Sequence, residues 1–217
     1  MNPKRNKRPP IRGTFLAMTA KQKLKKKPAV FLDRDGTMMV DVGYLKDPAQ
    51  IKLFSQTANA LKALRKAGYY LFVVTNQSGV ARGYFSEAQV KKVHQKLQGM
   101  LRAQGAKIDA FFYCPHHPSG KVKSLSKNCA CRKPSPGMIR QASKHYAIDL
   151  KNSFVVGDKM DDLLLAQNAK VVGGILVRTG NGRQSEKELK KVKLKNSVVV
   201  SNLFQAAQWI LSRKEIS

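Results

Sequence analysis

Six short apolar runs alternate along the chain with longer stretches in which apolar residues recur at helical spacing. Runs of this length without polar interruption are typical of strands that are buried on both faces. Their alternation with helical stretches predicts an α/β domain, a Rossmann-like parallel sheet with helices on both faces. The predicted strands are Ala29–Leu32, Tyr69–Val74, Ala110–Tyr113, Phe154–Val156, Gly174–Val177 and Val198–Val200.

Helix ends are marked by capping residues between these runs. Ser86 and Gln89 form a capping box, and Gly105 ends the amphipathic stretch that follows. The pair Ser135 and Pro136 has the residue types preferred at the cap and the first position of a further helix. The pattern therefore predicts a helix after Ser86 and another after Ser135.

Polar clusters follow three of the predicted strands. Asp33 and Asp35 come directly after the first strand, residues 75–79 read TNQSG after the second, and residues 157–159 read GDK after the fourth. Ligands of parallel sheets bind beyond the carboxyl ends of the strands, and these clusters all lie at that edge. One cluster alone is typical of a loop or a helix cap, but three at one edge predict a functional site.

The residue types at this edge are suited to phosphoryl transfer. We expect Asp33 to attack a phosphate monoester, and Asp158 to join it in holding Mg²⁺, which binds carboxylate oxygens. Asp35 would protonate the leaving oxygen and then deprotonate the hydrolytic water. Thr75 would hold the phosphoryl oxygens, and Lys133, just before a predicted helix, would neutralise their developing charge.

Net charge is the most unusual bulk property of the chain. The 217 residues include 41 Lys and Arg against 13 Asp and Glu, which leaves +28. Residues 1–27 hold ten of the basic side chains and no acid, and we predict that they form a basic, disordered extension to one domain at 28–217. A strong positive field attracts phosphates of any kind, so nucleic acid is a candidate partner.

Cellular location is predicted from what the sequence lacks. The chain has no apolar run long enough to span a membrane and no good secretory signal, so we expect a soluble, cytoplasmic protein. Met18 is our hypothesis for the physiological start of the chain.

A second cluster is indicated by all three cysteines of the chain. Cys114 and His116 precede a twelve-residue gap, and Cys129 and Cys131 follow it. Thiolate and imidazole ligands in this grouping are typical of a closed, structural zinc site, whereas a disulfide would leave an odd cysteine. His117 is an alternative to His116 as the fourth ligand.

Four motifs carry a resemblance to a known superfamily. "FLDRDGT", "TNQSG", "RKP" and "GDKMDD" stand in this order across residues 29–162 and resemble the haloacid-dehalogenase superfamily of phosphatases. No long insertion follows the first or second motif, so the resemblance implies a capless fold in which loops select the substrate. Relatives usually carry a glycine near residues 168–170, where this chain has Asn, Ala and Lys.

Within the superfamily, the zinc loop together with "TNQSGVARG", "DVGYL" and "LVRTGNG" resembles the heptose-bisphosphate 7-phosphatase family. This resemblance implies Mg-dependent removal of the C7 phosphate of D-glycero-D-manno-heptose 1,7-bisphosphate, in nucleotide-activated heptose and lipopolysaccharide core biosynthesis. It implies a magnesium site of Asp33, Asp35 and Asp158, and a zinc site of Cys114, His116, Cys129 and Cys131. The residues implied to touch the substrate are Asp41, Gly43, Tyr44, Thr75, Asn76, Gln77, Ser78, Arg132, Lys133 and Lys159.

Three other functions remain open. Histidinol-phosphate phosphatases share the four motifs and the zinc loop, although "TNQSGVARG" favours the heptose family. A polynucleotide 3′-phosphatase suits the charge but not the zinc loop. A nucleic-acid-binding protein with a degenerate active site is disfavoured because every catalytic position is intact. We therefore expect a monomer that acts on a sugar bisphosphate and contacts nucleic acid only non-specifically.

Overall fold

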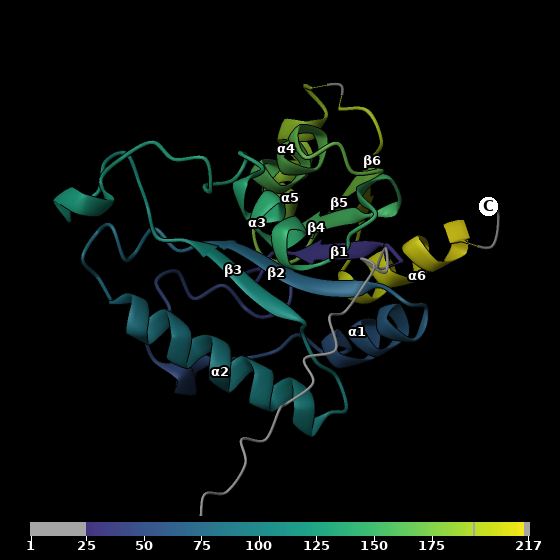
Figure 1. Ribbon diagram of the computed structural model, residues 1–217, viewed down its shortest axis with the longest axis horizontal. Coiled ribbons are helices and arrows are strands. Elements are labelled where there is room, and N and C mark those ends of the chain that lie inside the picture. Colours follow the sequence, from purple (N-terminus) through teal and green to yellow (C-terminus); the bar gives the residue numbers. More distant parts are fainter. Residues whose placement is uncertain (1–24, 193, 215–217) are drawn as a thin grey trace, which may run out of the picture.

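The computed structural model describes residues 25–192 and 194–214, and within them a six-stranded parallel sheet forms the centre of the molecule (Figure 1). The strands lie in the order β3-β2-β1-β4-β5-β6, so that the first strand of the chain is central. Each predicted apolar run contains a strand, which confirms the α/β prediction. The strands are β1 Ala29–Leu32, β2 Tyr70–Asn76, β3 Ala110–Cys114, β4 Phe154–Gly157, β5 Gly173–Val177 and β6 Ser197–Val200.

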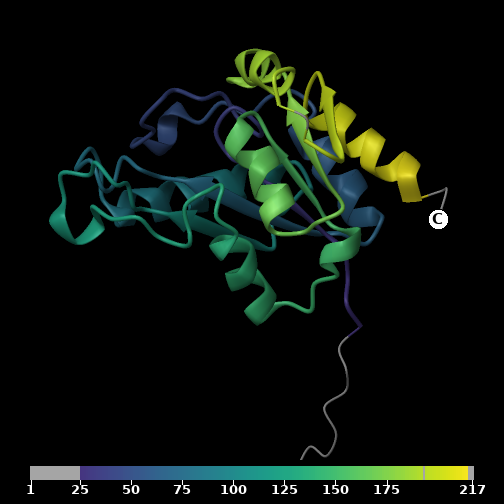
Figure 2. The ribbon, with the colours of Figure 1, turned by 90° about the horizontal axis from the view of Figure 1, so that it is seen from above.

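Helices cover both faces of the sheet (Figures 1 and 2). One face carries α1, α2 and α6, and the other carries α3 and α4, with α5 beside α4. Short 3₁₀ turns lie at Pro48–Gln50, Lys123–Leu125 and Leu150–Asn152. The helices are α1 Thr57–Lys66, α2 Glu87–Ala103, α3 Gly137–His145, α4 Met160–Asn168, α5 Gly182–Leu189 and α6 Leu203–Lys214.

β1 contributes to the apolar core on both faces, because side chains alternate along a strand. Ala29 and Phe31 pack with the residues of α3 and α4, whereas Val30 and Leu32 pack with those of α1, α2 and α6. All four are fully buried. The residue that follows, Asp33, therefore leaves a strand that is fixed from both sides, and its backbone N–H donates to Val156 O of β4 at 2.8 Å.

Helix α2 begins as predicted and α3 does not. The Ser86 hydroxyl accepts from the Gln89 N–H at 3.3 Å, and the Gln89 side chain accepts from the Ser86 N–H at 2.8 Å, which completes the capping box. By contrast, Ser135 does not cap α3. Its N–H donates to Arg132 O at 2.8 Å in a turn, and the helix begins two residues later at Gly137.

Lys170 adopts a left-handed backbone conformation with φ of 55° in the turn between α4 and β5. A side chain makes this conformation unfavourable by roughly 1–2 kcal/mol. The position lies in the stretch where the resemblance leads us to expect a glycine, yet the turn forms, and Val171 N–H donates to Ala166 O at 3.2 Å. The missing glycine therefore leaves the packing of α4 on the sheet intact.

Most of the predicted basic extension, including Met18, lies outside the described residues. Its last residue, Lys27, pairs with the segment after α3: its N–H donates to Ala147 O at 3.0 Å, and its carbonyl accepts from the Asp149 N–H at 2.9 Å. Among the helices of the described ranges, none has both the length and the apolar character needed to cross a membrane.

Candidate active site

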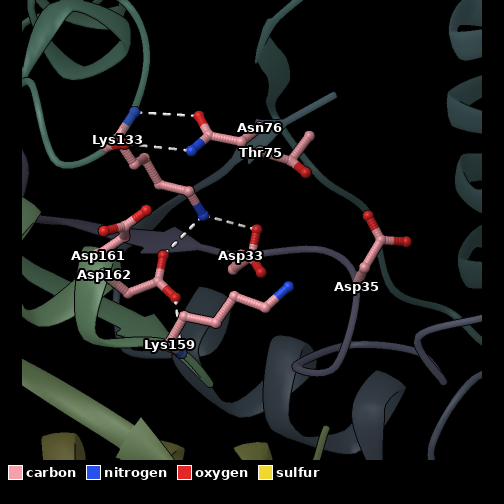
Figure 3. Close-up of a pocket in the computed structure, with 8 residues that line it drawn as sticks. All are labelled: Asp33, Asp35, Thr75, Asn76, Lys133, Lys159, Asp161 and Asp162. Atoms are coloured by element: carbon pink, nitrogen blue, oxygen red, sulfur yellow. Dashed lines mark hydrogen bonds and ion pairs between the residues drawn. The ribbon is translucent and has the colours of Figure 1, made fainter. Parts of the chain in front are cut away.

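The loops after β1, β2 and β4 meet at one edge of the sheet because these strands are parallel neighbours. Asp33 and Asp35 follow β1, Thr75 lies near the end of β2, and Asp158 follows β4. A cavity of about 40 Å³ opens among them, which is room for roughly three water-sized atoms. Its lining is Asp33, Asp35, Thr75, Asn76, Lys133, Lys159, Asp161 and Asp162 (Figure 3).

Lys133 reaches into this cavity from the segment before α3 and joins two acids. Its Nζ lies 2.7 Å from Asp33 Oδ1 and 2.6 Å from Asp162 Oδ1 (Figure 3). All three side chains are buried. Burial opposes the charged form of Lys133, but the two carboxylates outweigh it and raise its pKa. Burial opposes ionisation of Asp33 as well, yet the Lys133 charge holds the pKa of Asp33 below its usual value.

Asp162 is a site residue that the sequence analysis did not single out. Its Oδ1 accepts from Lys133, and its Oδ2 accepts from the Lys159 N–H at 3.1 Å at the start of α4. Both oxygens are thus engaged in fixing other parts of the site. The signal in the sequence was the third acid of the "GDKMDD" motif, one helical turn after Asp158.

Asp158 has one carboxylate oxygen without a partner. Oδ2 accepts from the Asn181 N–H at 2.8 Å, whereas the buried Oδ1 has no hydrogen-bond partner among the described residues. Burial and the neighbouring Asp33 charge raise the pKa of Asp158 to about 7. Asp33, Asp158 and Asp162 offer carboxylate oxygens that all lie within 4.8 Å of one another, a donor set of the kind that Mg²⁺ prefers.

Asp35 lies apart from this carboxylate group (Figure 3). The Arg34 Nη2 lies 2.9 Å from its Oδ2, and the Gln77 Nε2 donates to the same oxygen at 3.0 Å. Burial raises the pKa of Asp35, and the Arg34 charge opposes that rise. The side chain lines the cavity from the side opposite Asp162, so Asp35 as a third magnesium ligand stays a prediction.

A wider cavity of about 310 Å³ adjoins the first and shares Asp35, Asn76 and Lys159 with it. The Lys159 Nζ lies 3.3 Å from Asp41 Oδ2, which links the loops after β4 and β1. The volume of the wider cavity is within the range of small-molecule sites. The structure brings together here these predicted substrate residues: Asp41, Gly43, Tyr44, Asn76, Gln77, Ser78 and Lys159.

Two predicted substrate residues, Asn76 and Arg132, make contacts with the main chain of the loop before α3. The Asn76 amide pairs with the main chain of Lys133, accepting from its N–H at 3.0 Å and donating to its carbonyl at 3.2 Å. This contact locks the Lys133 segment onto the end of β2. Arg132 lines neither cavity, and its Nη1 lies 3.5 Å from His116 O.

Three sulfur atoms and one ring nitrogen form a second cluster in the loop between β3 and α3. The sulfurs of Cys114, Cys129 and Cys131 lie 3.2–3.4 Å apart, and His116 Nδ1 lies 3.3 Å from Cys131 Sγ and 3.7 Å from Cys114 Sγ. Ligands about 2.0–2.3 Å from a zinc ion at the centre of a tetrahedron are separated by roughly 3.3–3.8 Å. The cysteines are free thiols, so the cluster has the form of a zinc site.

His117 points away from this cluster. Its Nε2 lies 3.1 Å from Arg82 Nη2, and its Nδ1 accepts from the Ser119 N–H at 3.0 Å. Of the two histidines that the sequence left open, His116 is the one beside the sulfurs. The loop also rests on the segment after β2, where Val122 N–H donates to Ala81 O at 2.9 Å.

Comparisons with known proteins show which family the chain resembles. A model of the HAD-hydrolase-like family matches residues 130–206. The D-glycero-beta-D-manno-heptose-1,7-bisphosphate 7-phosphatase of Pasteurella multocida is 46% identical over 71% of this chain and 83% of its own length. An enzyme of Photorhabdus laumondii named for the alpha anomer is 41% identical over 83% of this chain and 94% of its own length.

A solved structure resembles the whole domain. The D,D-heptose 1,7-bisphosphate phosphatase of B. bronchiseptica, complexed with magnesium and phosphate, superimposes with a TM-score of 0.74 at 34% identity, over 86% of this chain and 99% of its own. The protein is thus a phosphoric monoester hydrolase of the haloacid-dehalogenase type. On these similarities, the chain belongs to the heptose-1,7-bisphosphate 7-phosphatase family.

Proposed function

We propose that the protein removes the C7 phosphate of D-glycero-D-manno-heptose 1,7-bisphosphate through an aspartyl-phosphate on Asp33. The observation that supports this best is the buried Lys133 ammonium 2.7 Å from Asp33 in a cavity of phosphoryl size. It keeps Asp33 ionised as a nucleophile and provides positive charge where the phosphoryl oxygens would lie. We infer the identity of the sugar from the names of the relatives, which are heptose 1,7-bisphosphate phosphatases.

The chemistry proceeds in two balanced steps. An Asp33 oxygen forms a bond to phosphorus while the bond between phosphorus and the C7 oxygen breaks, and that oxygen takes a proton from Asp35. Water then attacks the aspartyl-phosphate and gives a proton to Asp35, which releases phosphate and restores the Asp33 carboxylate. Thr75, almost fully buried beside the cavity, holds a phosphoryl oxygen through its hydroxyl.

The carboxylates fit a magnesium ion. Asp158 Oδ1 is buried without a partner among the described residues, and Asp33 offers a carboxylate oxygen within 4.8 Å of the Asp158 carboxylate in the group that could hold an ion. Asp162 is less available because Lys133 and the Lys159 N–H occupy its oxygens. We assign Asp33 and Asp158 as ligands, whereas the Asp35 side chain lies apart from this carboxylate group and is assigned to proton transfer. When bound, Mg²⁺ supplies the positive charge that lets an anionic carboxylate approach a phosphate group.

The zinc site is proposed as a structural element that holds the loop carrying Arg132 and Lys133. Cys131 directly precedes these two residues. A metal ion that fixes Cys131 would therefore also restrict the backbone of Arg132 and Lys133. Four protein ligands would leave no open position for substrate, which is typical of structural rather than catalytic zinc.

Zinc content should separate the two adjacent histidines. His116→Gln should lose the metal, because its Nδ1 is 3.3 Å from Cys131 Sγ, and Cys129→Ser should lose it as well. His117→Gln should retain close to one zinc per chain, because its ring bonds to Arg82 and Ser119 instead. Metal analysis of the purified proteins provides the measurement. Equal zinc in all three variants, or a metal-free wild type with full activity, contradicts the structural role.

The site should act only on the phosphate of a primary carbon. The small cavity adjoins the wider one, and among residues 25–192 and 194–214 no cap domain covers it, so an unhindered phosphate can bring its phosphorus in line with Asp33 most easily. The ring and its C1 phosphate would stay in the wider cavity. Phosphorus NMR of the product should therefore show a surviving 1-phosphate. A surviving 7-phosphate contradicts the proposed function.

Arg132 is expected to contribute to binding of the remaining phosphate. Arg132→Ala should lower kcat/KM for the bisphosphate more than for a simple monophosphate, since a planar guanidinium binds phosphate through two bonds. Arg140→Ala, an exposed change on α3, is the matched control and should alter neither value. Because Arg132 lines neither cavity, equal effects on both substrates would assign it to the loop alone.

A further inference from the structure

Arg34, the residue between the two catalytic acids, is buried rather than exposed. Only 1% of its surface is accessible, and it is among the largest fully buried side chains of the described residues. A guanidinium in the interior is strongly unfavourable unless its charge is paired and its N–H groups are bonded. Nothing in the proposed reaction steps uses Arg34, so its burial needs another explanation.

Arg34 forms a closed ring of hydrogen bonds with Asp35 and Gln77. Its Nε lies 3.2 and 3.1 Å from the two Asp35 carboxylate oxygens, and its Nη2 lies 2.9 Å from Asp35 Oδ2 and 3.0 Å from Gln77 Oε1. Gln77 Nε2 completes the ring by donating to Asp35 Oδ2 at 3.0 Å. Each of the three side chains is therefore bonded to the other two.

The ring determines which way the Gln77 amide faces. Arginine has donors and no acceptor, so only the amide oxygen of Gln77 can face it. The amide nitrogen must then face Asp35 and also Thr75, whose Oγ1 accepts from it at 2.9 Å. Since the Thr75 oxygen accepts this bond, its own hydrogen is left to be donated elsewhere, toward the cavity that Thr75 lines.

The position of Asp35 also follows from this ring. Asp35 lines both the small cavity and the wider one, and it lies on the side of Asp33 away from Asp162 (Figure 3). A phosphate in the small cavity with its sugar in the wider one would have its bridging oxygen at this border. Asp35 is thus held where a leaving oxygen must be protonated.

We propose that Arg34 is a positioning residue for the reaction. It holds Asp35 at the border between the two cavities for proton transfer, and through Gln77 it directs the Thr75 hydroxyl toward the phosphoryl group. Arg34 touches no substrate in this arrangement and acts through the residues that do. The inference rests on the proposed aspartyl-phosphate chemistry and goes beyond it by naming what controls the proton donor.

Leaving-group dependence provides the test. The 4-nitrophenolate of 4-nitrophenyl phosphate departs without a proton, whereas the alcohol of benzyl phosphate, a substrate of similar size, needs one. Arg34→Met should lower kcat/KM about 10–100-fold for benzyl phosphate and less than about 3-fold for 4-nitrophenyl phosphate, because kcat/KM reports the steps up to release of the alcohol. A purely structural defect would lower both values equally, and that result overturns the proposal.

A double-mutant cycle tests whether Arg34 acts through Asp35. Asp35→Asn should show the same dependence on the leaving group. Adding Arg34→Met to it should cause no further loss beyond the less than about 3-fold effect that both substrates share through Thr75. A further loss of about 10-fold or more for benzyl phosphate in the double variant contradicts the proposal. Arg34→Lys keeps the charge but has one nitrogen for two partners, so it should give an intermediate loss with the same dependence. It also provides the test if Arg34→Met does not fold.

Arg178→Met is the matched control. Arg178 makes a comparable two-point contact with Glu186, at 2.8 and 2.9 Å, but it is exposed and away from both cavities. Its loss should leave kcat/KM for both substrates unaffected, and circular dichroism should show that every variant used is folded at the assay temperature. If the wild-type protein hydrolyses neither ester nor heptose bisphosphate, both the proposed function and this inference are wrong. If the Arg34 variants lose kcat/KM equally for both esters, only this inference is wrong.

Discussion

Asp33→Asn should reduce phosphate release from heptose 1,7-bisphosphate by at least about 10³-fold. An amide is a far weaker nucleophile than the carboxylate it replaces, and it is also a poorer ligand for a magnesium ion, so both proposed roles fail together. The Lys133 ammonium would in addition lose a charged partner at 2.7 Å. Steady-state phosphate release, with a parallel attempt to trap a radiolabelled phosphoprotein, measures the effect.

Asp47→Asn provides the control for this change. Asp47 is exposed, and its side chain accepts only from the Ala49 N–H at 2.9 Å, a bond that asparagine can also accept. It should retain wild-type activity. Turnover of Asp33→Asn above a few per cent of wild type, in protein free of deamidation by mass spectrometry, would assign the nucleophile to another residue.

Lys133→Met should have the second-largest effect, a loss of about 10²–10³-fold in kcat/KM. A positive charge positioned at the reacting phosphoryl group should stabilise the transition state by about as much as one hydrogen-bond donor of an oxyanion hole. Removing it also leaves Asp33 and Asp162 buried side by side without their cation, and breaking such a pair costs about 3–5 kcal/mol of stability. We therefore expect lower activity together with a lower melting temperature.

The two consequences of losing Lys133 can be separated. The double change Lys133→Met with Asp162→Asn removes one of the stranded charges, so it should recover part of the melting temperature without recovering activity. Lys127→Met, in an exposed position of the same loop, should alter neither quantity. Full activity in folded Lys133→Met would show that phosphoryl charge is neutralised by other groups.

The sheet could be predicted because its central strands are buried on both faces. A run such as the one ending at Leu32 has no polar side, and each predicted run overlaps a strand. The start of α3 could not be predicted in the same way. Ser135 has the preferred type for a cap, but a turn bond to Arg132 O uses its backbone, and Gly137 approaches Ala130 so closely that a side chain there would clash.

The acids of the site were predictable from their place after strands, but their pairing was not. Asp162 lies four residues after Asp158, yet its role depends on Lys133, which comes 29 residues earlier in the chain. The contacts of Arg34 are even harder to predict from sequence. A charged residue between two acids suggests an exposed loop, and no local pattern indicates that its side chain turns inward to Gln77, 43 residues away.

β1 leaves the ribosome long before β4, the neighbour on one of its edges. Val30 pairs with Phe154, 124 residues later, and synthesis at about 5–20 residues per second separates the two by about 6–25 seconds. During that time the edge of a wholly apolar strand is open to other chains, which favours aggregation. Asp158 directly follows β4, so this edge stays open through most of the time before the nascent chain can acquire phosphatase activity.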